Sequence, residues 1–237
     1  MLGIVVAMDR EARIVRAALA ACGLTHAARV AVSGIGAPHA REAARALVDG
    51  GVTALAVIGL AGALVDGIAA GDLLLPDRVT DEQGGAIDGG APQAAALQQR
   101  LRDVAVVHAG LLASTARPLA SPAAKRALAM ACGAVAVDME SVAVARVARA
   151  AGLPWTVLRA VSDPVHRALP CCALRAVDGR GNLRLGALVV ALARRPWELG
   201  ALLALGRDAR RAQQVLAAAG AAVLPVLCTP IRVRGSA

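Results

Sequence analysis

The sequence predicts a single-domain α/β fold with a mostly parallel central mixed sheet flanked by helices. Up to Asp163, short runs of valine, leucine and isoleucine alternate with amphipathic segments of helical period, which is typical of a parallel sheet covered on both faces. The 237 residues can bury a large core, and their 57% hydrophobic content excludes a disordered chain. We find neither repeats nor a linker, and therefore expect one domain over residues 1–237.

The expected elements follow from local patterns. Leu2–Ala7 is a continuous apolar run that predicts a buried strand, and Asp9–Ala21 places its apolar residues on one side of a helix. Gly34-Ile35-Gly36 predicts a tight turn before the helix Pro38–Val48, which has proline in its first turn. Further strands are expected at Arg29–Ser33, Ala54–Ile58, Asp72–Leu75, Val104–Leu112, Ala134–Val137 and Trp155–Val161. Further helices are expected at Gln93–Arg102, Pro122–Ala131 and Glu140–Ala151, and loops at Gly59–Gly62 and Asp81–Pro92.

The chain changes character after Pro164. Leu185–Ala193 and Pro196–Ala219 are rich in leucine and alanine, so we expect two helices that hinge at Arg194-Arg195-Pro196. They make residues 183–219 an apolar helical C-terminal extension of the domain. A short turn is expected before them at Asp178–Asn182, and Ala221–Ala237 is expected to be an ill-defined tail.

The composition limits the partners and the redox chemistry. The net charge is +9, but Lys125 is the only lysine, the arginines are scattered, and the chain has no Phe or Tyr. A basic tract with aromatic platforms for bases is therefore missing, and we expect no nucleic-acid partner. The five cysteines form no CxxC pair, so neither a metal nor a disulfide framework is expected. With no secretory signal and no long apolar run, we expect a cytoplasmic protein, with peripheral contact to the inner membrane left open.

Two acidic stretches, Val137–Ser141 and Leu158–Asp163, follow buried runs and lie one helix apart. Ligands of open α/β sheets bind outside the carboxyl ends of the strands. One acid that donates a proton and another that holds hydroxyl groups suit cleavage of a bond to a sugar, so the sequence predicts an enzyme. The competing structural interpretations are a helix N-cap for Asp163 and a first-turn helix residue for Glu140.

These residues resemble the nucleoside phosphorylase superfamily, in particular its methylthioadenosine/S-adenosylhomocysteine nucleosidases. Five motifs occur in the family's order: Gly3–Glu11, Ser33–Gly36, Gly59–Gly62, Val137–Glu140 and Arg159–Asp163. A longer but looser match favours the hopanoid-associated phosphorylases. It includes Gly152–Trp155, Ser162–Pro164, Arg167–Pro170, the Asp-Gly-Arg turn and the later Arg-Pro-containing helices.

The resemblance implies release of adenine from a 5′-substituted adenosine, which in the hopanoid branch is adenosylhopane. The enzyme alternative is a methylthioadenosine/S-adenosylhomocysteine-type nucleosidase. By resemblance, Asp163 protonates the purine N7, Glu140 binds the ribose hydroxyls, Met139 packs on the sugar and Glu11 activates water. Residues that support the substrate site are expected to be Ser162, Arg159, Gly62, Ala61 and Met8.

The reaction type stays open. Glu11 favours water as the nucleophile, but Leu60 replaces the serine expected in the neighbouring loop, and phosphorolysis would use inorganic phosphate as a co-substrate. No other cofactor and no metal are expected. The Arg117-Pro118-Leu119 stretch stands where relatives have an aromatic residue to stack on the base.

The expected partners are a small-molecule nucleoside, which the hopanoid branch links to a lipid, and further copies of the chain in a homo-oligomer. The apolar extension 183–219 could form a lip that receives the lipid or contacts a membrane, or it could pack on the sheet or at a dimer interface. The alternative of another class is a non-catalytic nucleoside-binding or membrane-surface protein.

Overall fold

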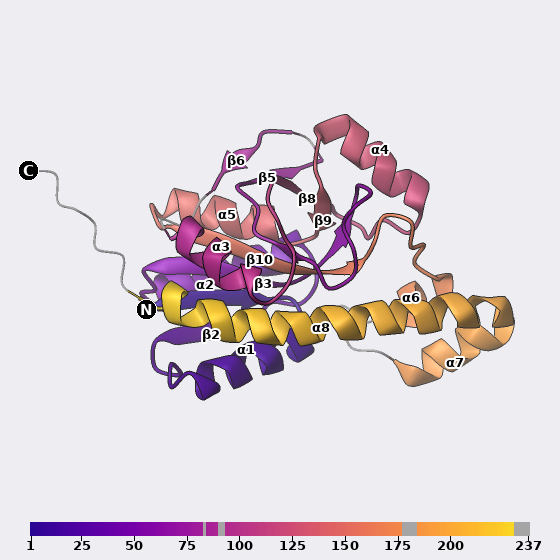
Figure 1. Ribbon diagram of the computed structural model, residues 1–237, viewed down its shortest axis with the longest axis horizontal. Coiled ribbons are helices and arrows are strands. Elements are labelled where there is room, and N and C mark those ends of the chain that lie inside the picture. The colour runs from indigo at the N-terminus through magenta and orange to yellow at the C-terminus, as the bar shows by residue number, and fades with distance from the viewer. Residues whose placement is uncertain (83, 90–92, 177–183, 230–237) are drawn as a thin grey trace, which may run out of the picture.

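A ten-stranded sheet runs through the middle of the molecule, between two layers of helices (Figure 1). The computed structural model describes residues 1–82, 84–89, 93–176 and 184–229. The strands are β1 (Leu2–Val6), β2 (Ala28–Val32), β3 (Ala54–Ala63), β4 (Leu73–Leu74), β5 (Arg78–Asp81), β6 (Ile87–Asp88), β7 (Val107–His108), β8 (Leu111–Ser114), β9 (Ala136–Asp138) and β10 (Trp155–Asp163).

The sheet is mixed but mostly parallel, as the sequence predicts. Its main path is β6-β5-β8-β9-β3-β10-β4-β7, and β1 pairs with both β2 and β3. Six strand pairings are parallel, and the three antiparallel ones join β10 to β4, β3 to β9 and β5 to β6. Because β1 and most of β3 are covered on both faces, they consist of continuous apolar runs. Strand β10 is equally buried, but it carries Arg159 among its apolar residues.

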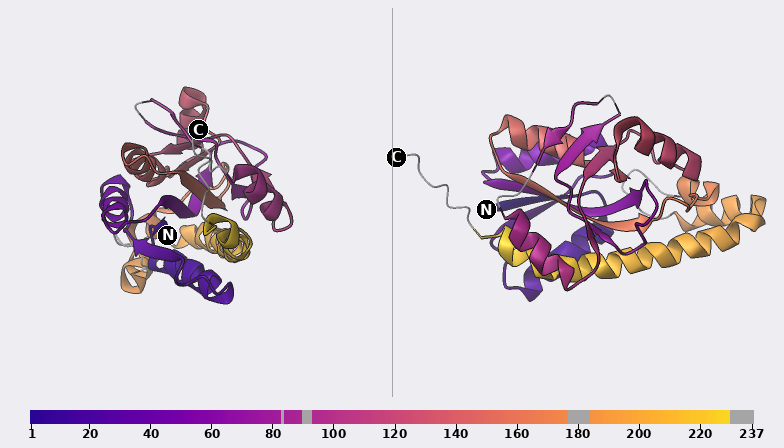
Figure 2. Two further views of the ribbon diagram at one scale, coloured as in Figure 1. Left: turned by 90° about the vertical axis from the view of Figure 1, so that its left-hand side faces the viewer. Right: turned by 45° about the horizontal axis from the view of Figure 1, so that its top comes forward.

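Helices cover the two faces of the sheet (Figure 2). The helices are α1 (Asp9–Ala21), α2 (Ala37–Asp49), α3 (Ala94–Arg102), α4 (Pro122–Cys132), α5 (Ser141–Ala150), α6 (Cys171–Ala176), α7 (Leu185–Arg194) and α8 (Leu199–Leu227), with a 3₁₀ turn, η1 (Pro196–Glu198), before α8. One apolar core lies under α2 and α5, and the other lies under α1, α3 and α8. A third, smaller cluster joins α4 to β8.

The two longest strands, β3 and β10, pair in parallel along most of their length. The pairing shifts register between Val161 and Asp163, so Ser162 is an extra residue in β10. Such a bulge re-aims the side chains that follow it. At this point the bulge brings Asp163 opposite Gly62, where the missing side chain leaves room for the carboxyl group.

Several sequence-based expectations about the elements are wrong. The predicted loop Gly59–Gly62 is part of strand β3, because β10 pairs with all of it. The predicted strand Val104–Leu112 is split into β7 and β8 at Gly110, which has a φ of +113°. The expected loop Asp81–Pro92 contains the end of β5 and all of β6, which pair as a hairpin. The expected tail after Ala221 begins as helix, since α8 continues to Leu227. The expected turn Asp178–Asn182 and residues 230–237 lie outside the described residues.

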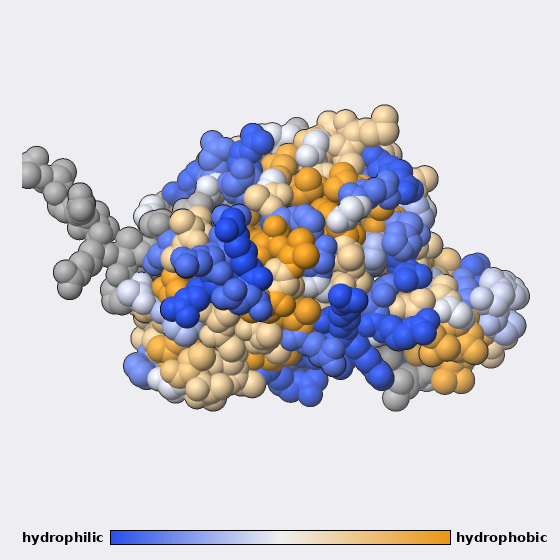
Figure 3. All heavy atoms as spheres, viewed as in Figure 1, coloured by the Kyte–Doolittle hydropathy of each residue, from blue (hydrophilic) through white to orange (hydrophobic). Residues whose placement is uncertain are grey.

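The long helix α8 has two different halves. Its C-terminal half is in the core, where Ala212, Leu216 and Ala219 are fully buried. Its N-terminal half extends beyond the sheet together with α7 (Figure 1), and hydrophobic residues gather on the outer surface of this extension (Figure 3). No helix among the described residues is both long enough and apolar enough to cross a bilayer.

Candidate active site

A pocket of about 340 Å³ lies where β1, β3, β9 and β10 end. Every residue that the sequence nominates for the site lines this pocket. They are Met8, Glu11, Ala61, Gly62, Met139, Glu140, Arg159, Ser162 and Asp163. The fold therefore assembles residues from four separate sequence motifs beside the carboxyl ends of these strands, where α/β proteins bind ligands.

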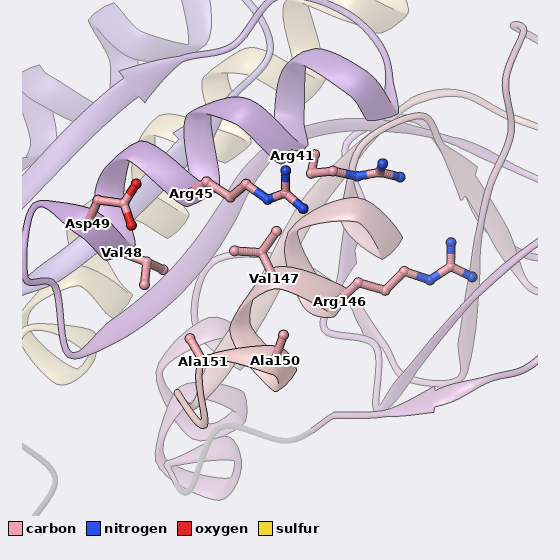
Figure 4. Close-up of a pocket in the computed structure, with 8 residues that line it drawn as sticks. All are labelled: Arg41, Arg45, Val48, Asp49, Arg146, Val147, Ala150 and Ala151. Carbon is pink, nitrogen blue, oxygen red and sulfur yellow. The ribbon is translucent and has the colours of Figure 1, made fainter.

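A second cleft of about 430 Å³ lies between α2 and α5, where Arg41, Arg45 and Arg146 extend from the two helices (Figure 4). These arginines are exposed, and Arg146 Nη2 donates to Asp81 Oδ2 at 2.6 Å. The lining contains no buried acid or nucleophile. Since reactive groups with shifted pKa values mark catalytic sites, we take the pocket at the sheet edge as the candidate active site.

Arg159 is at the centre of the site and is only 1% exposed. Its Nη2 contacts the carboxylate of Asp138 and lies 3.3 Å from Glu140 Oε2. Its Nε has no hydrogen-bond partner, which sets it apart from the other buried side-chain nitrogens and oxygens of the described residues. A buried guanidinium needs acidic partners of this kind, because desolvation of an unpaired charge is costly.

Asp138 connects Arg159 to the start of α5. Its carboxylate accepts hydrogen bonds from Ser114 Oγ at 2.5 Å, from the Ser141 hydroxyl and from the Ser141 backbone N–H at 3.3 Å. It therefore caps the first turn of α5. These contacts leave Asp138 with a structural function, and its neighbour Glu140 is the more available acid.

Glu11 is buried and accepts three backbone hydrogen bonds. Its Oε2 accepts from the N–H groups of Ala7 at 2.9 Å and Met8 at 3.1 Å, and its Oε1 accepts from Leu60 at 3.0 Å. Burial raises the pKa of Glu11, while Arg159 and these three N–H groups act in the opposite direction. Glu11 is thus held in place inside the protein and is not a solvated helix residue.

Glu140 lies immediately before α5, and its carboxylate reaches back to the turn after β2. Its Oε1 accepts a hydrogen bond from the Gly36 N–H at 2.9 Å. Burial raises the pKa of Glu140 to about 7, against the effect of Arg159. A carboxyl group with this pKa changes between its protonated and ionised forms near neutral pH.

Asp163 ends β10 directly after the bulge. Ser162 Oγ lies 2.7 Å from Asp163 Oδ1 and 3.3 Å from the Ala61 carbonyl, and can donate its one hydrogen to either. An ionised Asp163 accepts from this hydroxyl, whereas a protonated Asp163 can donate to it. Burial raises the pKa of Asp163, and Lys125 and Ser162 oppose this rise. No helix begins at Pro164, so the N-cap interpretation of Asp163 is wrong.

Lys125 is a site residue that none of the sequence motifs indicates. Its Nζ lies 2.6 Å from Asp163 Oδ2, and the side chain is 1% exposed. The two residues are 38 positions apart in the chain, and no local motif connects them. The one available signal is composition, because a single lysine remains in a chain whose other basic side chains are arginine or histidine.

The remaining wall of the pocket is apolar. It is formed by Pro118, Leu119, Leu169, Leu205 and Ala209. Leu205 and Ala209 belong to α8, so the helical extension contributes directly to the site. Pro118 and Leu119 lie in the pocket at the stretch where relatives are expected to have an aromatic residue.

Four carboxyl groups and two cations line the site. The Arg159 guanidinium contacts Asp138 and Glu140, and the Lys125 amino group contacts Asp163. Within the described chain, no three His, Cys, Asp or Glu side chains converge in a way that could bind a metal. The acids here are partnered by Arg159 and Lys125, so the chemistry that this lining offers is proton transfer and recognition of hydroxyl groups.

A family model described as Phosphorylase superfamily matches residues 18–193. The chain belongs to the phosphorylase superfamily. This confirms the superfamily that the sequence motifs resemble, and the fold agrees with it. No curated protein sequence matches this superfamily member at a significant level.

Solved structures share the fold of this phosphorylase-superfamily chain. A methylthioadenosine nucleosidase mutant of Helicobacter pylori is 20% identical, with 92% of this chain and 96% of that chain covered and a TM-score of 0.65. The methylthioadenosine/S-adenosylhomocysteine nucleosidase of Neisseria meningitidis is 17% identical, with coverages of 93% and 98% and a TM-score of 0.64. Futalosine hydrolase of H. pylori is 20% identical, with coverages of 92% and 96% and a TM-score of 0.61.

Proposed function

We propose that this phosphorylase-superfamily enzyme cleaves the N-glycosidic bond of a 5′-substituted adenosine and releases adenine. The observation that carries the proposal is the placement of two buried acids, Asp163 and Glu140, on opposite sides of strand β3 in one pocket. The solved relatives include enzymes described as nucleosidases and as a hydrolase of futalosine. We assign adenosylhopane as the preferred substrate, following the resemblance to hopanoid-associated phosphorylases.

Asp163 is assigned as the general acid. Cleavage of the bond between C1′ and N9 builds negative charge on the purine, and a proton delivered to N7 relieves it. An acid for this step must be protonated beforehand, and burial favours the protonated form of Asp163. The Ser162 hydroxyl accommodates either protonation state, so it can accept the acid's hydrogen bond before the purine binds.

Glu140 is assigned to the ribose. Its ionised carboxylate accepts hydrogen bonds from the 2′ and 3′ hydroxyls and offsets the positive charge of the oxocarbenium-like sugar. The Gly36 N–H and Arg159 hold the carboxylate from two sides. Met139, the adjacent residue of the lining, packs on the sugar.

Water is the nucleophile that the lining favours, with Glu11 as its base. Both cations of the lining, Lys125 and Arg159, already contact carboxyl groups. Binding of a phosphate dianion calls for unpaired arginines or a cradle of free N–H groups. Here the N–H groups of Ala7, Met8 and Leu60 already donate to Glu11.

The apolar wall is assigned to the adenine and to the 5′ substituent. Leu169, Leu205 and Ala209 offer no hydrogen-bonding side chains, so they favour a hydrocarbon over a charged amino-acid tail at the 5′ position. A hopane skeleton is a large rigid hydrocarbon. We propose that the bound skeleton extends out of the pocket along the N-terminal half of α8.

The extension formed by α7, η1 and the start of α8 is proposed to contact the membrane from which such a substrate comes. Val189, Val190, Trp197 and Leu203 are exposed on it, and arginines flank this surface. Flotation with anionic liposomes tests the idea with the Val189→Ser/Trp197→Ser variant, and Met130→Ser, an exposed apolar residue on α4, is the control. Equal flotation of both variants and wild type would contradict membrane contact through this surface.

A homo-oligomer also remains a prediction, and light scattering measures the oligomeric state.

Adenine release decides the function. We expect wild type to release adenine from adenosylhopane faster than from methylthioadenosine, without added phosphate. Preference for methylthioadenosine would assign the enzyme to the nucleosidase alternative, and a requirement for phosphate would make it a phosphorylase. Release from neither substrate, despite binding of the nucleoside, would indicate a non-catalytic nucleoside-binding protein.

A further inference from the structure

Lys125 makes contacts that a lysine buried only for packing does not need. Its Nζ lies 2.6 Å from Asp163 Oδ2, 3.0 Å from the Pro164 carbonyl and 3.2 Å from the Arg167 carbonyl. The Asp163 backbone carbonyl is a fourth, longer contact at 3.4 Å, so the Asp163 carboxyl group and the carbonyls of Pro164 and Arg167 account for the three N–H bonds of an ammonium group. The two carbonyls can only accept hydrogen bonds, so they hold the amine as a donor toward Asp163.

The start of helix α4 positions Lys125 beside Asp163. Ser121 Oγ caps the helix by accepting from the Ala124 N–H at 3.2 Å, and Pro122 occupies the first turn. Lys125 follows one turn later and points inward, while Arg126 beside it points to the surface and pairs with Asp66 at 3.2 Å. A planar guanidinium could not donate in the three directions that this ammonium serves.

We propose that Lys125 is a positioning residue that stabilises the charge left on Asp163 when this acid gives its proton to the leaving purine. The proposal rests on the proposed function. In the step, the Asp163 O–H bond breaks and an N7–H bond forms. The C1′–N9 bond breaks, and its electron pair goes to the purine. Asp163 becomes a carboxylate paired with Lys125, which keeps all of its protons.

The interaction between Lys125 and Asp163 is stronger in the transition state than in the ground state. A neutral Asp163 gains only a hydrogen bond from Lys125, whereas an ionised Asp163 gains a buried ion pair, so the interaction grows as the proton leaves. Other groups that face Asp163 are few. Asp208 of α8 opposes ionisation, and Arg167 Nε offsets Asp208 from 2.8 Å. Ser162 contributes a neutral hydroxyl.

The test is the pH profile of adenine release by Lys125→Met, compared with wild type and with Arg126→Ala as the matched control on the same helix. Activity requires protonated Asp163, so the alkaline limb reports its ionisation. Without Lys125 the pKa of Asp163 rises further, because a stabilising positive charge is lost. We expect the alkaline limb to move up by about one unit or more, and kcat to fall by about 10- to 100-fold with a smaller change in KM. Arg126→Ala should change neither.

Two comparisons keep the outcome interpretable. If Lys125→Met does not fold, Lys125→Gln serves instead, since its neutral amide can still donate to the carbonyls. In an Asp163→Asn background the Lys125 substitution should have no further effect on kcat, because there is no charge to stabilise. A fall in kcat without movement of the alkaline limb, or an equal fall in the Asp163→Asn background, would overturn the proposal. Absence of adenine release by wild type would overturn the proposed function instead.

Discussion

The side chains of Glu11 and Arg159 both lie against the backbone of Gly59. A β-carbon at position 59 would collide with both Arg159 Nη1 and Glu11 Oε1, so any side chain at this strand position would displace these two groups. The positive charge of Arg159 acts on Glu11, the acid assigned to activate the nucleophile, and the same guanidinium pairs with Asp138 and Glu140. Gly59 therefore couples the site of the nucleophile to the site of the ribose.

We expect Gly59→Ala to lower kcat/KM by about 100-fold, because the added methyl group displaces both charged side chains, and small misplacements of this kind are costly. Overpacking should also lower the free energy of unfolding by about 1–3 kcal/mol. Kinetics and urea unfolding measure the two effects. Gly200→Ala is the control, since its added methyl group meets nothing within 4 Å. Wild-type activity in Gly59→Ala would contradict the arrangement.

Arg159→Met should be strongly destabilising, because it leaves Asp138 and Glu140 buried without their cation. Breaking a buried pair by removal of one partner lowers the free energy of unfolding by about 3–5 kcal/mol. The control is Arg146→Ala, whose ion pair with Asp81 is partly exposed and should contribute under about 1 kcal/mol. Urea unfolding compares them. Equal losses would show that Arg159 is not the centre of the acidic cluster.

Stability should depend on pH through Glu140. Folding raises its pKa from 4.5 to about 7, so the folded state holds the proton more tightly than the unfolded state does. Its stabilising contribution is complete below pH 4.5 and is lost as pH rises through about 7. The loss is roughly 3–4 kcal/mol, at about 1.4 kcal/mol for each unit of pKa.

The measurement for Glu140 is the difference in unfolding free energy between wild type and Glu140→Gln, followed by urea unfolding from pH 4 to pH 8. The amide cannot titrate, so the difference isolates Glu140 from Glu11 and Asp163, whose pKa values are also raised by burial. We expect wild type to lose stability relative to the variant as the pH rises. A difference that is independent of pH would contradict the assignment.

The apolar wall should select the 5′ substituent. Ala209→Trp is expected to raise KM for a long hydrocarbon substituent by about 10-fold or more and to change KM for methylthioadenosine less, because the indole fills space that only the longer group needs. Ala201→Trp is the control, because it lies on the same helix but is exposed and outside the pocket lining. Equal effects on both substrates would place the 5′ group elsewhere.

The strand ends of the site could be predicted from sequence, because Asp138–Glu140 and Asp163 directly follow apolar runs that form β9 and β10. Their neighbours in space could not all be predicted. The contact of Lys125 with Asp163 depends on how α4 packs across the end of β10, and nothing in local spacing specifies that.

The errors in the fold have similar causes. Gly59–Gly62 has the composition of a loop, yet pairing with β10 makes it strand, since tertiary contacts outweigh weak local preference. The end of α8 contains Pro225, which suggests a helix end, but Val223, Leu224 and Leu227 are buried in the core beside α1 and keep it helical. In both places long-range packing determines the structure.

The most direct test of the account compares wild type and Asp163→Asn on methylthioadenosine and on its 7-deaza analogue, which cannot accept a proton at N7. We expect wild type to release adenine from the first substrate and to leave the analogue intact. Asp163→Asn should bind methylthioadenosine but cleave it about 10²- to 10⁴-fold more slowly. Cleavage by Asp163→Asn at the wild-type rate, or cleavage of the analogue by wild type, would contradict the assignment of Asp163 as the acid.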